Sequence, residues 1–228
     1  ARELNIGFVS RMTRGRPWLR LKAAASLDGK TALNNGVSQW ITGPDARQDG
    51  HRWRARACAI LTGIGTVRDD DPQLNVRAVA TTRQPLRVVV DSKLETPLTA
   101  RILQGGQVLI AAAVDDEKRA NLLRSAGAEV LVLPNAAGKV ELKDLLEELG
   151  RRGINEVHAE AGFKLNGSLL REGLVDELLL YLAPCLIGHA ASGVFNLPEL
   201  ATLDGKRRLQ IRDLRQVGED IRLIARPR

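Results

Sequence analysis

Short apolar runs and amphipathic segments follow one another along most of the chain. The run Val108–Ala113 is continuously apolar and Leu86–Val90 is nearly so, which is typical of parallel strands buried on both faces. The segment Val140–Arg152 instead places its apolar residues three and four positions apart, which predicts an amphipathic helix. Strands that alternate with helices in this way predict an α/β fold with a mostly parallel central sheet flanked by helices.

The same reasoning assigns the remaining elements. Strands are expected at Trp18–Ala25, Cys58–Thr62, Leu86–Val90, Val108–Ala113, Val130–Leu133, Glu156–Glu160, Glu177–Leu186, Leu209–Val217 and Ile221–Ala225. Further helices are expected from Gly43-Pro44-Asp45 to about Ala57, over Asp115–Ser125, and from the turn Ala161-Gly162 to near Gly173. The turn Gly218-Glu219-Asp220 joins the last two strands and predicts a C-terminal antiparallel hairpin. We expect one domain over residues 17–228, preceded by a basic lead-in over residues 1–16.

The composition narrows the class of partner. The chain carries 34 basic and 27 acidic residues, a net charge of +7. Such a surplus suits nucleic-acid binding, but the basic residues are scattered and the aromatic residues, 3% of the chain, form no stacking platform. An anionic small substrate explains the surplus equally well, and nucleic-acid binding is the less favoured hypothesis.

The apolar runs and the cysteines indicate a cellular location. The longest runs, such as Leu178–Ala183, are far too short to cross a membrane, and no secretory leader follows Ala1. Cys58 and Cys185 lie far apart in apolar stretches, so we expect buried free thiols in a reducing cytoplasm. We expect no membrane partner, and the chain is compatible with a piece of a longer protein.

Two glycine-rich segments follow predicted strands, at Thr62–Thr66 and at Gly162–Ser168. A strand that ends in glycine and leads into a helix exposes backbone N–H groups that bind anions. Neither segment is a GxGxxG or GxxxxGK[ST] motif, so phosphate binding and ordinary turn formation remain equally open. The arginines Arg52, Arg54, Arg56 and Arg77 suit phosphate capture, although solvated helix arginines are the commoner case.

One apparent metal motif is rejected. His158-Ala159-Glu160 with Pro184-Cys185 resembles the zinc deaminase signature H-x-E…P-C-x-x-C, but the second cysteine would fall on Gly188. Too few ligands remain for zinc, and His158 in a strand is more simply a packed histidine. We therefore expect no metal. No G-x-S-x-G motif is present either, so hydrolysis by a serine–histidine pair is not expected.

Several blocks resemble the reductase domain of the bifunctional riboflavin-biosynthesis deaminase/reductase. They occur in that family's order and cover about residues 17–226. The blocks are Leu21-Lys22-Ala23-Ala24-Ala25-Ser26-Leu27-Asp28-Gly29-Lys30, Ser38-Gln39-Trp40-Ile41-Thr42, Thr62-Gly63-Ile64-Gly65-Thr66-Val67-Arg68-Asp69-Asp70-Asp71-Pro72, Leu74 to Arg77, Asp91-Ser92 and Glu160-Ala161-Gly162.

The resemblance implies a dihydrofolate-reductase-like fold and a specific reaction. That reaction is the NADPH-dependent reduction of 5-amino-6-(5-phosphoribosylamino)uracil to its ribitylamino counterpart. The lead-in Asn5-Ile6-Gly7-Phe8 looks like the tail of the zinc deaminase domain that precedes the reductase in the family. A homodimer is expected too, because an exposed apolar edge would suit one. Another pteridine or pyrimidine reductase of the same fold, and a nucleic-acid-binding module, remain alternatives.

The resemblance also transfers contacts position by position. The substrate contacts of the family fall on Ser38, Arg54, Leu74, Arg77 and Glu160. The cofactor contacts fall on Ala24, Trp40, Thr66, Asp70, Ser92 and the segment Gly162, Phe163, Lys164, Leu165, Asn166, Gly167 and Ser168. The cofactor carries the hydride, so the protein has to supply orientation and electrostatics. Lys22 and Glu160 are the candidates for assisting that step, although a solvated strand lysine is an equal interpretation of Lys22.

Overall fold

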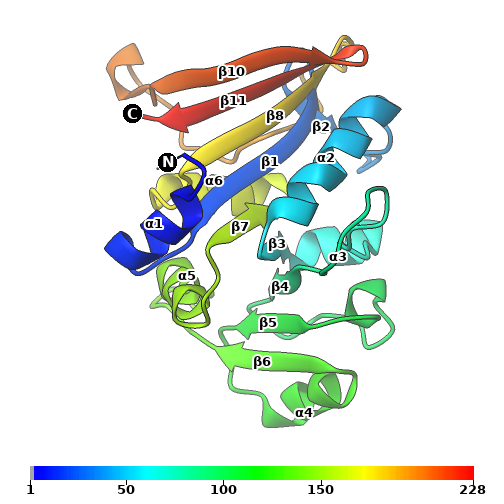
Figure 1. The fold of residues 1–228 in the computed structure, drawn as a ribbon, viewed down its shortest axis with the longest axis vertical. Coiled ribbons are helices and arrows are strands. Elements are labelled where there is room, and N and C mark those ends of the chain that lie inside the picture. Colours follow the sequence, from blue (N-terminus) through cyan, green and yellow to red (C-terminus); the bar gives the residue numbers. More distant parts are fainter. Residues whose placement is uncertain (1–2) are drawn as a thin grey trace. The chain divides into compact units, whose positions relative to one another are not determined.

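The computed structural model describes residues 3–228, drawn as a ribbon in Figure 1. The chain divides into two compact units. The first unit comprises the chain up to Trp18 together with Arg52–Ala159, and the second comprises Leu19–His51 and Glu160–Arg228. Helix α2 (Pro44–Arg56) begins in the second unit and ends in the first. The expected boundary at residue 17 stays a prediction, and residues 1 and 2 of the expected lead-in lie outside the described residues.

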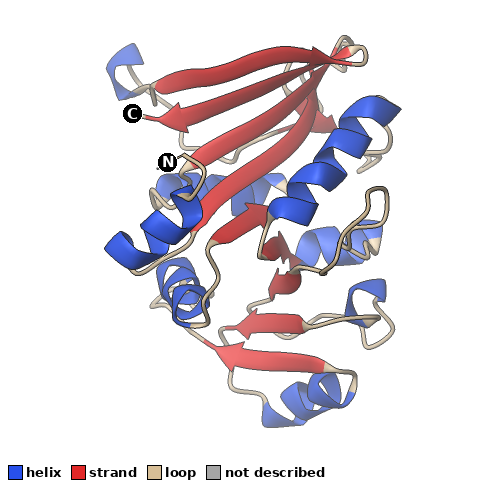
Figure 2. Ribbon diagram, in the orientation of Figure 1, coloured by secondary structure: helices blue, strands red, loops and turns tan. Residues whose placement is uncertain are grey.

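Parallel strands form the sheet of the first unit, in the order β7-β3-β4-β5-β6. These strands are β3 (Ala59–Gly63), β4 (Leu86–Val90), β5 (Val108–Ala112), β6 (Ala128–Val132) and β7 (Glu156–Ala159). The unit also contains α1 (Ile6–Arg14), α3 (Ile64–Asp70), α4 (Glu117–Ser125), α5 (Leu142–Arg151) and the 3-10 turn η1 (Arg101–Leu103) (Figure 2). Every residue of β5 is buried, as its continuous apolar run predicts.

The second unit contains the strand order β10-β11-β8-β1. Strand β1 (Trp18–Ser26) pairs in parallel with β8 (Glu177–Ala183), whereas β8, β11 (Asp220–Pro227) and β10 (Leu209–Val217) are antiparallel. A small antiparallel pair joins β2 (Lys30–Ala32) and β9 (Ser192–Gly193), and the unit also holds α6 (Phe163–Arg171) and the turn η2 (Leu203–Gly205). The expected α/β fold with mostly parallel strands and a C-terminal antiparallel hairpin is confirmed.

A hydrogen-bonded network centred on Asp49 joins helix α2 to the C-terminal strands of the second unit. Tyr181 Oη donates to Asp49 Oδ2 at 2.7 Å, and Arg222 Nη1 donates to the same oxygen at 2.9 Å. Arg222 Nη2 reaches Asp213 at 2.9 Å. Burial, followed by the hydrogen bond to Asp49, raises the pKa of Tyr181, so its hydroxyl stays a donor. This network ties α2 to strands β8, β10 and β11.

The structure adds elements that the pattern did not predict. Helix α1 occupies the lead-in, where Gly7 packs so closely that a Cβ would lie 2.5 Å from Glu156 Cγ. The glycine-rich segment after β3 leads into helix α3, which is capped by Asp71 in a left-handed backbone conformation (φ 40°). The expectation of a buried Cys185 was wrong: β8 ends at Ala183, so this free cysteine lies in an exposed loop, while Cys58 is half-buried.

Candidate functional site

The alternation of strand β1 places Lys22 and Ala24 on the same face. Lys22 Nζ lies 3.6 Å from Glu160 Oε2, and both side chains are largely shielded, at 23% and 13% exposed. The two residues expected to assist the reaction are therefore brought together, and Lys22 is partly shielded and ion-paired rather than fully solvated. A shielded ammonium–carboxylate pair can hold a proton donor and a proton acceptor side by side.

The expected ligand contacts Ser38 and Trp40 lie in the loop between β2 and α2. Ser38 is half-buried, whereas Trp40 is 68% exposed. Arg47, in the first turns of α2, places its guanidinium carbon 4.7 Å from the centre of that ring. This cation–π contact supports one face of the ring.

The expected cofactor segment forms the start of helix α6 in the second unit. Gly162 is its N-cap, offers no side-chain cap, and leads into a first turn without an acidic residue. Backbone N–H groups at such a helix end, together with the helix dipole, favour an anion. The fit to a pyrophosphate is therefore good at Gly162 and at the exposed neighbour Lys164.

The rest of this segment packs inward. A Cβ at Gly167 would overlap the backbone of Asn196. Asn166 is 2% exposed, and its Nδ2 donates to the Val194 carbonyl at 3.2 Å. The Ser168 hydroxyl is used within the helix, where it donates to the Lys164 carbonyl at 3.2 Å. The segment Val194–Asn196 thus clamps the start of α6.

Two of the expected substrate residues of the first unit meet at Asn75. Arg54 Nη1 donates to the Asn75 carbonyl at 3.4 Å, and Arg77 Nη1 donates to the Asn75 side-chain oxygen at 3.0 Å. Leu74 has a left-handed backbone (φ 46°) and a buried side chain, whereas Arg77 is exposed. Any contact of Leu74 with a ligand therefore has to use its backbone.

The other expected cofactor residues of the first unit lie at helix α3 and after strand β4. Thr66 is half-buried and Asp70 is exposed on α3, and Ser92 accepts a hydrogen bond from the Val140 N–H at 3.3 Å. The neighbouring Asp91 is fully buried, and its carboxylate accepts from the N–H groups of Glu95 and Thr96 and from the Thr96 hydroxyl. The Asp91 carboxylate therefore accepts its hydrogen bonds from the turn that follows β4.

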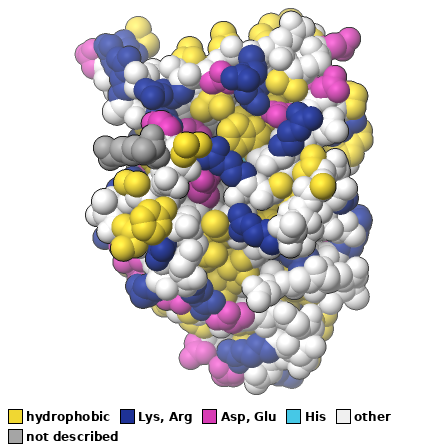
Figure 3. Space-filling model, in the orientation of Figure 1, with side chains coloured by type: hydrophobic (Ala, Val, Ile, Leu, Met, Phe, Trp, Pro, Cys, Tyr) yellow, Lys and Arg dark blue, Asp and Glu magenta, His cyan; other side chains and the backbone are white. Residues whose placement is uncertain are grey.

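Two further features of residues 3–228 concern metal ligands and apolar helices. No cluster of three or more histidine, cysteine, aspartate or glutamate residues there could hold a metal ion. His158 is fully buried in β7, opposite Ile60 of β3. Across the same residues, no helix combines the length and the apolar character that a bilayer crossing requires. On the face drawn in Figure 3, lysine and arginine side chains are distributed among acidic and apolar ones.

The parallel strands of both units, the C-terminal antiparallel hairpin and the glycine-capped helix α6 define an α/β protein. Residues 17–223 match the RibD C-terminal domain family. The chain belongs to this family, as its sequence blocks indicate.

Curated relatives and solved structures agree with this placement. The chain is 39% identical over 234 residues to the riboflavin biosynthesis protein RibD of Escherichia coli (strain K12), covering 97% of this chain and 63% of that protein. It is 40% identical over 241 residues to the RibD protein of Haemophilus influenzae, covering 100% and 63%. The structure of Acinetobacter baumannii RibD (form 2) is 38% identical, with a TM-score of 0.88 over 100% of this chain and 62% of that one.

A more distant structure supports the fold alone. The riboflavin biosynthesis reductase of Saccharomyces cerevisiae is 20% identical, with a TM-score of 0.71 over 99% of this chain and 100% of that one. The expected dihydrofolate-reductase-like fold is confirmed. The chain spans less than two thirds of the length of the RibD relatives named above.

Sequence reasoning missed the residues that support the site. Arg47, Asn75 and Asp220 were not singled out, yet each contacts a segment that carries an expected ligand contact. For Asn75 the sequence did offer a signal, because it lies only two positions from Arg77. No local signal connects Asp220 to Gly43.

Proposed function

We propose that this chain is an NADPH-dependent reductase that converts 5-amino-6-(5-phosphoribosylamino)uracil to the ribitylamino product in riboflavin biosynthesis. The family membership supports the class of reaction. The observation that carries the choice of a phosphorylated substrate is the meeting of Arg54 and Arg77 at Asn75. Two guanidinium groups held by one residue suit paired hydrogen bonds to a phosphate.

The Lys22–Glu160 pair would assist the chemistry. A nicotinamide cofactor, when bound, supplies the hydride. If the ribosylamine opens to an imine, C1′ becomes electrophilic, and a proton at the imine nitrogen favours attack. We propose that Lys22 Nζ, held 3.6 Å from Glu160 Oε2, keeps a proton available at that nitrogen. Trp40 and the start of α6 would orient the cofactor.

The direct test is NADPH oxidation, followed at 340 nm, with the phosphoribosylamino-pyrimidine as substrate. Oxidation that depends on this substrate and yields the ribitylamino product supports the proposal. Oxidation only with a different pteridine or pyrimidine identifies another reductase of the same fold. Steeply salt-dependent binding to DNA or RNA without any oxidation would overturn the reductase assignment.

We expect kcat/KM to be about 10-fold higher with NADPH than with NADH. Ser92 and the exposed Lys93 follow β4, and the Lys93 ammonium can make a charge-assisted hydrogen bond to a 2′-phosphate. An acidic residue at such a strand end can instead select an unphosphorylated ribose. Asp91 is unsuited to that role, since its carboxylate is buried and bonded within its turn. Steady-state kinetics with both cofactors check this. The Lys93→Ala variant should lose most of the preference, and equal kcat/KM values in the wild type contradict it.

We also propose a homodimer formed through one face of the C-terminal hairpin. The register of β10 and β11 places Ile211, Leu214 and Ile221 on the same face, where they are 61%, 62% and 38% exposed. β10 is the last strand in the order of its unit, so this apolar face continues to a strand edge. A second copy would bury the same residues symmetrically.

The Leu214→Arg variant should therefore be monomeric at concentrations where the wild type is a dimer, as measured by sedimentation velocity. Leu203→Arg is the matched control, because Leu203 is 76% exposed and lies outside the hairpin. A wild type that sediments as a monomer at all concentrations contradicts the proposal.

The remaining parts of the proposal concern context. We propose that the natural protein joins this domain to a zinc deaminase domain, because the chain covers only 63% of each RibD relative named above. We propose a cytoplasmic location, to which two free cysteines are suited. We propose that the reductase reaction itself uses no metal.

A further inference from the structure

The loop that carries Ser38 and Trp40 ends at Gly43, directly before helix α2. Two side chains outside the expected contact set hold this end of the loop. Asp220 approaches it from the C-terminal hairpin, and Arg47 approaches it from α2. All of these residues belong to the second unit.

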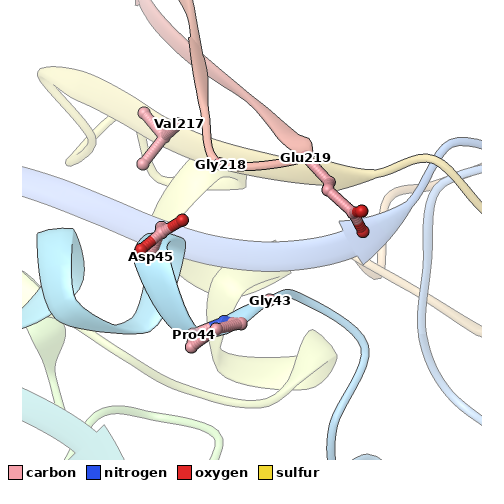
Figure 4. A pocket seen from close by; sticks show the side chains of 6 residues that line it. All are labelled: Gly43, Pro44, Asp45, Val217, Gly218 and Glu219. Carbon is pink, nitrogen blue, oxygen red and sulfur yellow. The ribbon is translucent and has the colours of Figure 1, made fainter.

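Asp220 is 1% exposed, and its Oδ2 accepts a hydrogen bond from the Gly43 N–H at 2.8 Å. The turn that precedes it passes close to the start of α2, since a Cβ at Gly218 would lie 2.6 Å from Asp45 Oδ2. Figure 4 shows Gly43, Pro44 and Asp45 facing Val217, Gly218 and Glu219 across a small cavity. A buried carboxylate that bonds a backbone N–H fixes the position of that peptide group.

Arg47 holds the same loop end through a second pair of contacts. Its Nη1 donates to the Thr42 carbonyl at 2.6 Å, and its guanidinium lies against the Trp40 ring. A planar guanidinium can bond a carbonyl at one edge and stack on a ring with its face, which lysine does less well. One side chain thus sets both the backbone at Thr42 and the orientation of Trp40.

We propose that Asp220 and Arg47 are positioning residues for ligand binding. The C-terminal hairpin, through Asp220, holds the loop in the conformation in which Ser38 and Trp40 meet their ligands. This inference rests on the proposed function of those two residues. If the binding-competent loop conformation becomes a fraction of the population, the apparent Kd rises by the inverse of that fraction.

The Asp220→Ala variant should raise the Kd for NADPH and the KM for the pyrimidine about 10-fold, because one charge-assisted hydrogen bond is lost. The kcat at saturation should change less than about 2-fold, since ligand binding restores the loop. Asp220→Asn, whose amide oxygen still accepts from Gly43, should recover most of the loss. Glu219→Gln, at the adjacent exposed position, is the control and should match the wild type.

Arg47→Ala should raise the Kd for NADPH about 5-fold, because Trp40 loses its support, and Arg47→Lys should recover only part of it. Intrinsic NADPH fluorescence measures these constants. Equal Kd values for Arg47→Ala and the wild type would overturn the role of Arg47.

Hydrogen–deuterium exchange of the free protein separates this proposal from the proposed function. Peptides that cover residues 33–43 should exchange about 10-fold faster in Asp220→Ala than in Glu219→Gln, with unchanged exchange in the core strand β5. Unchanged exchange in the loop overturns the proposal whatever the enzyme reduces. Faster exchange with unchanged Kd and KM overturns it too. If Asp220→Ala does not fold, Arg47→Ala provides the same comparison against Glu219→Gln, because Arg47 bonds the Thr42 carbonyl in the same loop.

Discussion

We expect the Arg77→Ala variant to lose about 10- to 150-fold in kcat/KM for the phosphorylated substrate, since a hydrogen bond to a charged group contributes about 1.5–3 kcal/mol. Arg54→Ala should behave alike, because both guanidinium groups meet at Asn75. The phosphate is remote from the reacting C1′, so its binding energy positions that carbon for hydride transfer. The NADPH affinity should change little.

The control for these variants is Arg56→Ala. Arg56 lies on helix α2 together with Arg54, but its Nε pairs with Glu156 Oε2 at 3.2 Å. The wild type should have a low kcat/KM for a substrate without the phosphate. Loss of Arg54 or Arg77 should change that low value little. If these variants instead lose NADPH binding and keep the preference for the phosphorylated substrate, the two arginines serve the cofactor.

The second large effect concerns stability. Asp49→Ala should lower the free energy of unfolding by about 3–5 kcal/mol, because Tyr181 and Arg222 lose their shared buried acceptor. For a chain of this length that corresponds to a fall in Tm of roughly 6–20 °C. Differential scanning calorimetry measures the change directly.

Two variants show whether the loss comes from the buried network. Tyr181→Phe removes one hydroxyl only and should cost about 1–2 kcal/mol. Arg215→Ala removes a pair with Asp213 whose arginine is 59% exposed, and it should cost less than about 1 kcal/mol. A Tm for Asp49→Ala no lower than that of Arg215→Ala would falsify the assignment of stability to this network.

Much of the fold follows from the spacing of apolar residues. Strands Leu86–Val90 and Leu209–Val217 begin and end where predicted. The amphipathic pattern over 140–152 corresponds to helix α5 (Leu142–Arg151), which is slightly shorter at both ends than the predicted helix. Helix α3 could not be predicted in the same way, because its seven residues are too few for a period to emerge and its glycine and aspartates indicate a turn.

The site was less accessible to sequence reasoning. The residue blocks located Lys22 and Glu160, but their pairing arises from chain segments far apart in sequence. The alternating pattern of β11 gave no sign that Arg222 is 8% exposed, because an arginine in a strand is usually on the solvent side. Its burial depends on Asp49, which lies 173 positions away.

The clamp of Val194–Asn196 on the start of α6 has a thermodynamic consequence. Phe163 O accepts from the Asn196 N–H at 3.1 Å, and Gly167 leaves no space between the helix and that segment. The N–H groups that we propose as an anion site are therefore held in place before any ligand arrives. Calorimetric titration with a pyrophosphate-containing ligand should then show little entropic penalty from ordering this helix, so that affinity there reflects hydrogen bonding and desolvation.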